Sequence, residues 1–227
     1  MRLRVLFGVL VIQVFLAGHC SAENADDSLL AYAVNIHRTP EQSWPGYGIY
    51  LGKGLFITAA HVVGRAWMTR PKVVIAGREY PTQVVKEGSF EGTDLTLLSI
   101  EESVLPLRLR LRRNSLCTDP PSPGKRVVSV IPDRTVRSYV IAPARIPIAT
   151  RRFSTAIADV AETGNSGSGV FDAQRRCLVG IMSRKISQSG TRAGTGKTET
   201  RDIAKYFVPA SEIAAFLPAG LTSDLNQ

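Results

Sequence analysis

The stretch ETGNSGSGVF, residues 162–171, holds two serines within three positions, and a glycine stands beside each of them. A cluster of glycine and serine ahead of an apolar run is most often a tight turn. A serine can also be a nucleophile, provided that another side chain takes its proton and main-chain N–H groups stabilise the developing oxyanion. The rest of the chain therefore decides whether Ser166 or Ser168 reacts.

A base and a carboxylate for such a serine are present upstream. His61 lies in GLFITAAHVVG, at the end of a strand pattern, where a buried core histidine is the alternative interpretation. Asp94 opens the run DLTLLSI directly after a turn, where an aspartate that caps the turn is the alternative. His37, beside a polar loop, is typical of a surface histidine. In enzymes that transfer acyl groups, a carboxylate orients a histidine, and the histidine activates a serine.

The glycines favour Ser166 over Ser168. Gly164 lets the backbone turn its N–H groups inward without a Cβ clash, and Gly167 leaves room for a substrate. Ser168 has no glycine two positions before it. Neither serine fits the strand–turn–helix pattern G-x-S-x-G, which argues against an α/β-hydrolase.

The pattern of the whole chain predicts an all-β protein in two halves. Six short apolar or β-branched runs lie within residues 31–100, and six more lie within residues 125–208. The segment 101–124, rich in proline and arginine, is typical of a linker. The run PASEIAAFL predicts a short C-terminal helix, with Pro209 at its start.

In chain order the motifs are TAAH, TDLTLL and GNSGSGV. Together they resemble the serine peptidases of the chymotrypsin/trypsin fold over about residues 31–217, and most of all compact bacterial members such as the high-temperature-requirement proteases. The resemblance implies two six-stranded antiparallel β-barrels, about residues 31–100 and 125–217, with the active site in the cleft between them. It implies polypeptide substrates and no cofactor.

The resemblance also assigns roles to single residues. His61 would be the general base, Asp94 would orient it, and Ser166 would attack the scissile carbonyl and form an acyl-enzyme. Main-chain N–H groups of Gly164 and Ser166 would form the oxyanion hole.

The same resemblance places a pocket for the substrate side chain around residues 160–163 and 181–184. Glu162 would favour a basic substrate residue and Arg184 an acidic one, whereas Val160 and Met182 would favour an apolar one. The sequence leaves these three preferences open. The expected lining is Val160, Glu162, Met182, Ser183 and Arg184.

Three departures from the family pattern qualify the resemblance. Asn165 replaces the aspartate that pairs with a new N-terminus in trypsins, so we expect no activation of that kind. Ser168 and Gly169 replace the glycine and proline of the common GSGGP. We expect no peptide-binding PDZ module after the C-terminal helix. The leading alternative is a non-catalytic relative that binds peptides or partners through the same cleft.

Residues 1–22 have the pattern of a secretory signal peptide that is cut after Ala22. Their apolar run is short for a membrane span, which needs about 20 residues. We therefore expect an exported protein, periplasmic or secreted, without a stable membrane anchor once the signal is removed. Cys117 and Cys177 then remain, and they are either one disulfide or two separate thiols.

The mature chain is basic, because the formal charge of +9 falls by the two signal-peptide arginines to 9 − 2 = +7. Arginine and leucine alternate in LPLRLRLRRN, residues 105–114, as in a strand or an extended linker with one wet face. This stretch would attract an anionic polymer or is only a solvated face. Without interleaved aromatic residues, we expect no binding of nucleic acid.

Two other patterns carry less weight. The stretch GTRAGTGKT, residues 190–198, has Thr191 where a phosphate-binding loop requires glycine, and it predicts a glycine-rich loop beside the cleft. Two histidines in the mature chain, with few clustered acids, argue against a metal site. The sequence does not predict an oligomeric state.

Overall fold

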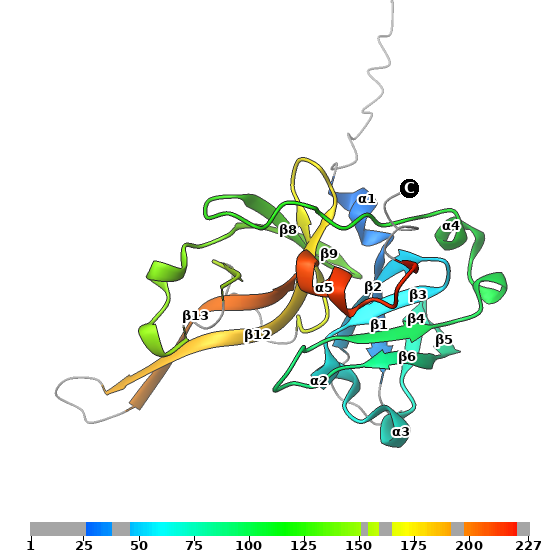
Figure 1. Cartoon of the computed structure of the whole chain (residues 1–227), viewed down its shortest axis with the longest axis horizontal. Coiled ribbons are helices and arrows are strands. Elements are labelled where there is room, and N and C mark those ends of the chain that lie inside the picture. Colours follow the sequence, from blue (N-terminus) through cyan, green and yellow to red (C-terminus); the bar gives the residue numbers. More distant parts are fainter. Residues whose placement is uncertain (1–25, 38–45, 151–153, 159–164, 192–197, 222–227) are drawn as a thin grey trace, which may run out of the picture.

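The computed structural model describes residues 26–37, 46–150, 154–158, 165–191 and 198–221. Two curled antiparallel sheets, one from each half of the chain, make up the fold (Figure 1). The strand orders are β5-β4-β1-β2-β3-β7-β6 and β10-β13-β12-β11-β8-β9. The predicted all-β fold of two antiparallel barrels is confirmed. No helix among the described residues is both long and apolar enough to span a membrane.

The N-terminal half and the linker contain short helices besides strands. Their bounds are α1 (Asp27–Leu30), β1 (Ala33–His37), β2 (Gly46–Gly52), β3 (Leu55–Thr58), α2 (Ala60–Val63), α3 (Ala66–Thr69), β4 (Lys72–Ile75), β5 (Arg78–Pro81), β6 (Gln83–Glu87), β7 (Thr96–Ser99), η1 (Glu102–Val104) and α4 (Leu107–Arg110). The C-terminal half contains β8 (Arg126–Ile131), β9 (Arg134–Tyr139), η2 (Pro143–Arg145), η3 (Ile148–Thr150), β10 (Ala156–Ile157), β11 (Gly169–Asp172), β12 (Leu178–Thr191), β13 (Thr198–Pro209) and α5 (Ala210–Phe216).

The described N-terminal sheet has one strand more than the six that the sequence predicts, because the run YPTQVVK forms two strands. β5 ends at Pro81, which has no N–H to continue a ladder. The Thr82 hydroxyl donates to the Pro71 carbonyl (2.6 Å), and the chain passes there from pairing with β4 to pairing with β7. Pattern alone does not show this change of partner.

β12 and β13 are much longer than the runs that predict them. They pair from Gly180↔Pro209 to Thr191↔Thr198 and form a hairpin that projects far beyond the sheet, as Figure 1 shows. The described ends of GTRAGTGKT lie at the tip of this arm, and residues 192–197 lie outside the described part. The prediction of a loop beside the cleft was therefore wrong for these ends, because they lie far from the place where the two sheets meet.

The leucine–arginine stretch is a short helix and not an extended segment. Both residue types are good helix formers, and Pro106 is the N-cap of α4. Leu105 and Leu109 are buried in the core of the N-terminal sheet. The alternation therefore anchors α4 on one side and leaves Leu107 and Leu111 exposed on the other.

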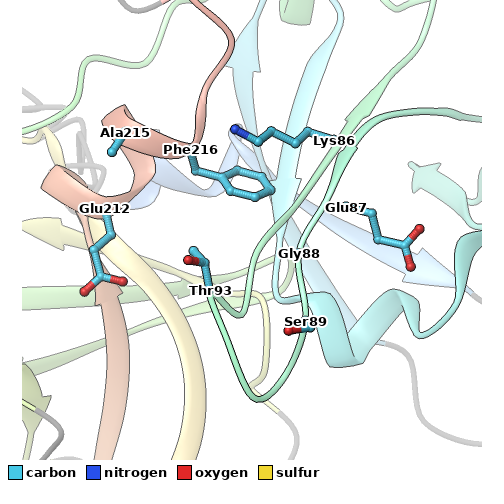
Figure 2. Close-up of a pocket in the computed structure, with 8 residues that line it drawn as sticks. All are labelled: Lys86, Glu87, Gly88, Ser89, Thr93, Glu212, Ala215 and Phe216. Atoms are coloured by element: carbon cyan, nitrogen blue, oxygen red, sulfur yellow. The ribbon is translucent and has the colours of Figure 1, made fainter.

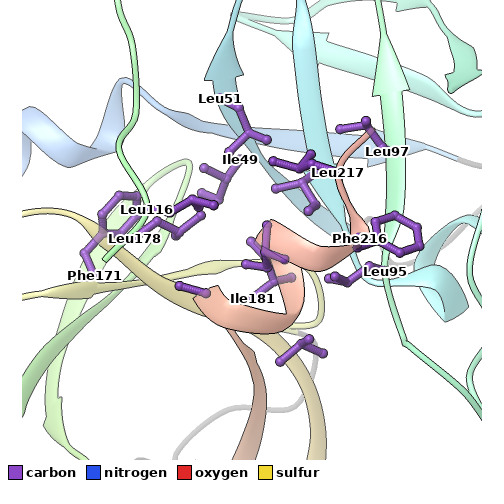
Figure 3. Packing of buried hydrophobic residues seen from close by; sticks show 14 of the residues in the cluster. Ile49, Leu51, Leu95, Leu97, Leu116, Phe171, Leu178, Ile181, Phe216 and Leu217 are labelled. Carbon is purple, nitrogen blue, oxygen red and sulfur yellow. The ribbon is translucent and has the colours of Figure 1, made fainter. Parts of the chain in front are cut away.

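The two sheets share one hydrophobic core, which α5 completes (Figure 3). Ile49 and Leu97 come from the N-terminal sheet, Ile181 from the C-terminal sheet, and Ile213 and Phe216 from α5. α5 is the predicted C-terminal helix. Because burial of apolar area is the main stabilising contribution to packing, this shared core fixes the relative placement of the loops that each half contributes.

A disulfide joins Cys117 to Cys177, which decides the alternative that the sequence left open. The linker also pairs with the beginning of β12. The Cys117 N–H donates to the Leu178 carbonyl (2.9 Å), and the Leu178 N–H donates to the Ser115 carbonyl (2.8 Å). The linker is therefore attached to the start of β12, the strand that carries Met182 and Ser183.

Candidate active site

The predicted base and carboxylate meet where two neighbouring interior strands of the N-terminal sheet, β3 and β7, end and begin. His61 lies in α2, directly after β3, and Asp94 lies just before β7, which pairs with β3 through Thr58↔Thr96. The His61 Nδ1 lies 2.8 Å from Oδ2 of Asp94, and the His61 main-chain N–H donates to Oδ1 (3.1 Å). His37 lies elsewhere, with its Nδ1 3.5 Å from Oε1 of Glu79.

Asp94 is held as a carboxylate although its side chain is only 1% exposed. Burial alone would raise the pKa of Asp94. Hydrogen bonds from His61 and from Ser183, whose hydroxyl donates to Oδ2 (2.5 Å), lower the pKa of Asp94 below its usual value. The charged carboxylate therefore accepts a hydrogen bond from Nδ1–H of His61, and in this tautomer Nε2, on the far side of the ring from Asp94, is the acceptor.

The turn that carries Ser166 is held by main-chain hydrogen bonds. The Tyr47 N–H donates to the Ser166 carbonyl (3.0 Å), which joins this turn to β2 of the other sheet. The Gly167 N–H donates to the Met182 carbonyl (2.8 Å), and the Ser168 N–H donates to the Asn165 carbonyl (3.0 Å). The amides of residues 167 and 168 are thus already occupied within the protein.

Gly167 is the residue on which this turn depends. Its φ is +84°, a left-handed conformation that L side chains rarely adopt. A Cβ added there would lie 1.9 Å from the Tyr47 carbonyl oxygen. The backbones of the two halves therefore approach each other more closely at this point than any other residue would permit.

Burial distinguishes the two serines. Ser166 is partly exposed, and its hydroxyl donates to the Ser183 carbonyl (3.2 Å). Ser168 is fully buried, and its Oγ has no hydrogen-bond partner within the described chain. A nucleophile must reach a substrate, so of the two only Ser166 is placed to react.

Sequence reasoning missed Phe90, which packs against the histidine. The Phe90 and His61 rings lie edge to face with centroids 5.4 Å apart. The Arg184 guanidinium lies 3.9 Å from the centre of the Phe90 ring and donates to the Phe90 carbonyl (2.7 Å). It also approaches Oδ2 of Asp94 to 4.0 Å. Arg184 therefore holds the 88–93 loop over His61.

The remaining predicted residues fall into two groups. Gly164, Val160 and Glu162 lie outside the described residues. Met182 is buried in the core of the C-terminal sheet, and the Ser183 hydroxyl is turned toward Asp94. The composition of the substrate pocket stays a prediction.

One group of three side chains in the described ranges has the donor types and spacing of a metal site: Cys117, Cys177 and Asp172. Its two sulfurs form the disulfide. Asp172 in turn pairs with Lys125 at 2.9 Å. These donors are therefore already used, and this cluster does not suit a metal ion.

A pocket lies between the 88–93 loop and α5, as Figure 2 shows. The Lys86 ammonium lies 4.7 Å from the centre of the Phe216 ring on one wall, and Glu212 lies on another. None of His61, Asp94 and Ser166 lines it. The pocket is separate from the candidate active site, although its wall is the loop that carries Phe90.

Comparison with known proteins agrees with this geometry. A family model described as a trypsin-like peptidase domain matches residues 46–181, a range that contains His61, Asp94 and Ser166. No curated protein matches the sequence.

Solved protease structures share the fold. The Rv3671c protease of M. tuberculosis is 16% identical with a TM-score of 0.56, and the match covers 89% of this chain and 92% of that one. The Yersinia pestis serine endoprotease is 20% identical (TM-score 0.57; 88% of this chain, 65% of that one). The MamO protease domain of Magnetospirillum magneticum is 19% identical (TM-score 0.52; 84% and 97%). At these identities the likeness is one of fold.

Proposed function

This chain belongs to the family of trypsin-like peptidase domains, and from that premise we propose that it is an exported serine endopeptidase. The observation that carries the proposal is the hydrogen-bonded pair of His61 and Asp94 at the N-terminal sheet. The partly exposed Ser166 lies beside this pair, on a turn of the C-terminal sheet. Ser183 joins the two, since its hydroxyl donates to Asp94 and its carbonyl accepts from Ser166.

In the proposed reaction Ser166 Oγ attacks the carbonyl carbon of the scissile peptide bond. Nε2 of His61 takes the serine proton as the carbon–oxygen bond forms, and it gives that proton to the leaving amine as the carbon–nitrogen bond breaks. Water then attacks the acyl-enzyme while His61 takes a proton from it, and the ester bond breaks as His61 returns that proton to Ser166 Oγ and the carboxylic acid product leaves. Asp94 keeps its charge throughout and stabilises the imidazolium.

The hydroxyl of Ser166 has to change partner for this reaction. It now donates to the Ser183 carbonyl, and catalysis requires it to donate to Nε2 of His61 instead. Rotation about the Cα–Cβ bond of serine is a change between staggered rotamers and needs no movement of the backbone. Catalytic hydrogen bonds are often longer or differently aimed before substrate binds.

We assign the oxyanion hole to the main-chain N–H groups of Ser166 and Gly164. The amides of Gly167 and Ser168 donate to carbonyls of the protein, which leaves the Ser166 amide as the donor nearest the nucleophile. Gly164 enters through the family resemblance alone.

Export is part of the proposal and rests on two features. Residues 1–22 have the pattern of a cleaved signal peptide. The disulfide between Cys117 and Cys177 is a feature of proteins that fold in an oxidising compartment.

A fluorophosphonate probe tests the activity directly, because it reacts only with an activated serine. We expect an adduct on Ser166, located by mass spectrometry, which disappears in Ser166→Ala and in His61→Ala and persists in the matched control Ser168→Ala. A folded wild-type protein that stays unlabelled would instead support a non-catalytic relative that binds peptides through the same cleft.

A peptide library then tests the proposed pocket. Cleavage after basic, acidic or apolar residues would point to Glu162, to Arg184, or to Val160 and Met182. Exchange of Glu162 or Val160 should shift the preference while the rate of probe labelling stays within about threefold of wild type. Exchange of Arg184 should also lower that rate, because Arg184 holds the 88–93 loop over His61.

A further inference from the structure

The α4 segment presents apolar side chains to solvent beside Arg108, Arg110 and Arg112, which pair with no carboxylate of the described residues. Val104 is 50% exposed, Leu107 is 60% exposed, and Leu111 is 76% exposed. Leu107 and Leu111 are four residues apart, and the Leu111 N–H donates to the Leu107 carbonyl (3.2 Å), so their side chains share one face of the helical turn. We call Val104, Leu107, Leu111 and the neighbouring arginines the α4 face.

The α4 face is held firmly to the protein. Leu105 and Leu109 are each 3% exposed and pack in the core of the N-terminal sheet. The exposed leucines are therefore held in place by a fixed helix, and the fold leaves most of their surface in contact with solvent. Exposed apolar side chains that lie together, unlike single ones, are a feature of surfaces that bind a partner or a membrane.

The charges on the α4 face are positive and unbalanced. Arg113 lies 3.4 Å from Glu102. Within the described part of the chain, no carboxylate pairs with Arg108, Arg110 or Arg112, and the Arg112 guanidinium lies 5.5 Å from the centre of the Tyr32 ring. A surface with this composition attracts an anionic partner that also accepts apolar side chains.

We propose that the α4 face docks on an anionic lipid bilayer. The arginines bind the phosphate-bearing headgroups, while Leu107, Leu111 and Val104 enter the boundary of the acyl chains. Neither contribution alone suffices for stable attachment, and the combination of an apolar and a basic signal is what peripheral membrane binding requires.

The composition argues against two other partners. Two copies that meet through this face would bring Arg108, Arg110 and Arg112 of each copy together, and the repulsion between these charges disfavours a symmetric dimer. A nucleic acid would use the arginines, but it offers no apolar region for exposed leucines, and the face has no aromatic residue for stacking.

The position of the α4 face agrees with a bilayer as partner. Tyr32, just after α1, donates from its hydroxyl to the Arg113 carbonyl (3.0 Å). The segment that follows the apolar N-terminal stretch is thus in contact with the α4 segment. In Figure 1, α4 lies at the opposite end of the molecule from the β12–β13 arm. Docking through α4 therefore leaves the arm directed away from the membrane.

Co-sedimentation with vesicles tests the proposal. We expect the protein to bind vesicles of phosphatidylcholine mixed with phosphatidylglycerol, to bind vesicles of phosphatidylcholine alone far less, and to be released by salt. Leu107→Ser with Leu111→Ser should weaken binding at least tenfold. Arg108→Gln with Arg112→Gln should weaken it about 25-fold, because each basic residue near an anionic surface contributes about fivefold. All variants share one N-terminus, so any contribution of residues 1–22 cancels.

Ile148→Ser with Arg145→Gln is the matched control, since Ile148 is 78% exposed and Arg145 is an exposed arginine in the C-terminal half. This pair should leave binding unchanged. Equal loss in the control, or no binding to anionic vesicles at low salt, overturns the proposal. The proposal also fails if the protein binds an oligonucleotide through these arginines while Leu107→Ser with Leu111→Ser binds vesicles as wild type does. It fails as well if the wild-type protein is a dimer in solution and the double leucine variant is a monomer. Circular dichroism melts exclude misfolding.

Discussion

The two sides of the candidate active site are held in different ways. On the N-terminal side, His61 and Asp94 are joined by side-chain hydrogen bonds, and Asp94 is almost completely buried. On the C-terminal side, the turn around Ser166 is fixed through main-chain groups and the left-handed Gly167. The first side should therefore be sensitive to the chemistry of its side chains, and the second to the conformation of its backbone.

The largest effect is expected from Asp94→Asn, which keeps the shape but removes the charge. An amide cannot hold His61 in the required tautomer or stabilise its imidazolium, so kcat should fall about 10⁴-fold. Peptide hydrolysis or the rate of fluorophosphonate labelling measures this. A loss of less than tenfold in a folded variant would show that the side-chain pair does not control the chemistry.

Gly167→Ala tests the backbone side of the comparison. The added Cβ would meet the Tyr47 carbonyl and would also strain a left-handed residue, so unfolding free energy should fall by about 3 kcal/mol or more. Gly77→Ala is the matched control: its φ is +79°, and nothing lies within 4 Å of the added atom. It should lose only about 1 kcal/mol. Urea unfolding would contradict this prediction if both variants lost the same amount.

Asp172 is a second buried aspartate, in the C-terminal sheet, and it should affect stability and not catalysis. Burial opposes its charge, but main-chain N–H groups of Gln174 and Arg175 and the Lys125 ammonium lower the pKa of Asp172 well below its usual value. A carboxyl with a lowered pKa stabilises the folded state above its unfolded pKa of 3.8, and this contribution is lost as the pH falls further.

Asp172→Asn should therefore lower the unfolding free energy by about 2 kcal/mol at pH 7. The difference in unfolding free energy from wild type should become smaller as the pH falls below about 4. Chemical unfolding at several pH values measures it. A difference that stays constant with pH would mean that the charge of Asp172 does not contribute.

Ser183→Ala should have a smaller effect on the N-terminal side. It removes one of the hydrogen bonds to Asp94 but leaves the bonds from His61, so kcat should fall about tenfold. Ser187→Ala is the control, because that hydroxyl donates to Asp202 on the arm. Equal activity of both variants would show that Ser183 does not help to position Asp94.

The smallest effect is expected from Ser168→Ala. This change removes a buried hydroxyl that has no partner in the described part of the chain, so stability should stay the same or rise by up to about 1 kcal/mol. Probe labelling of Ser166 should be unchanged. A clear loss of stability or labelling would mean that the Ser168 hydroxyl supports the turn after all.

The sequence predicts those parts of the molecule that depend on neighbours in the chain. Strand runs follow from local apolar patterning, and the order of His61, Asp94 and Ser166 is a combination of three local motifs. The helix α5 follows from Pro209 and the helix-forming residues after it. In each case the physical cause lies within about ten residues.

The sequence does not predict contacts that the fold creates between distant segments. Arg184 and Phe90 are 94 residues apart, and neither stands in a motif that would pair them. The change of partner at Thr82 depends on which strand lies beside it in space. The burial of Ser168 beside the partly exposed Ser166 results from the left-handed Gly167, which sequence alone identifies only as a small residue.

The disulfide between Cys117 and Cys177 also affects the unfolded chain. The two cysteines are 60 residues apart, and closing a loop of that size removes conformational entropy from the unfolded state that amounts to about 4 kcal/mol in the chain-entropy model. Typical domains are stable by only about 5–15 kcal/mol. The closed loop contains the Ser166 turn and excludes His61 and Asp94. Reduction of the disulfide would therefore give more conformational freedom to the unfolded segment that carries Ser166. It would not change the unfolded segment that carries His61 and Asp94, because that segment lies outside the closed loop.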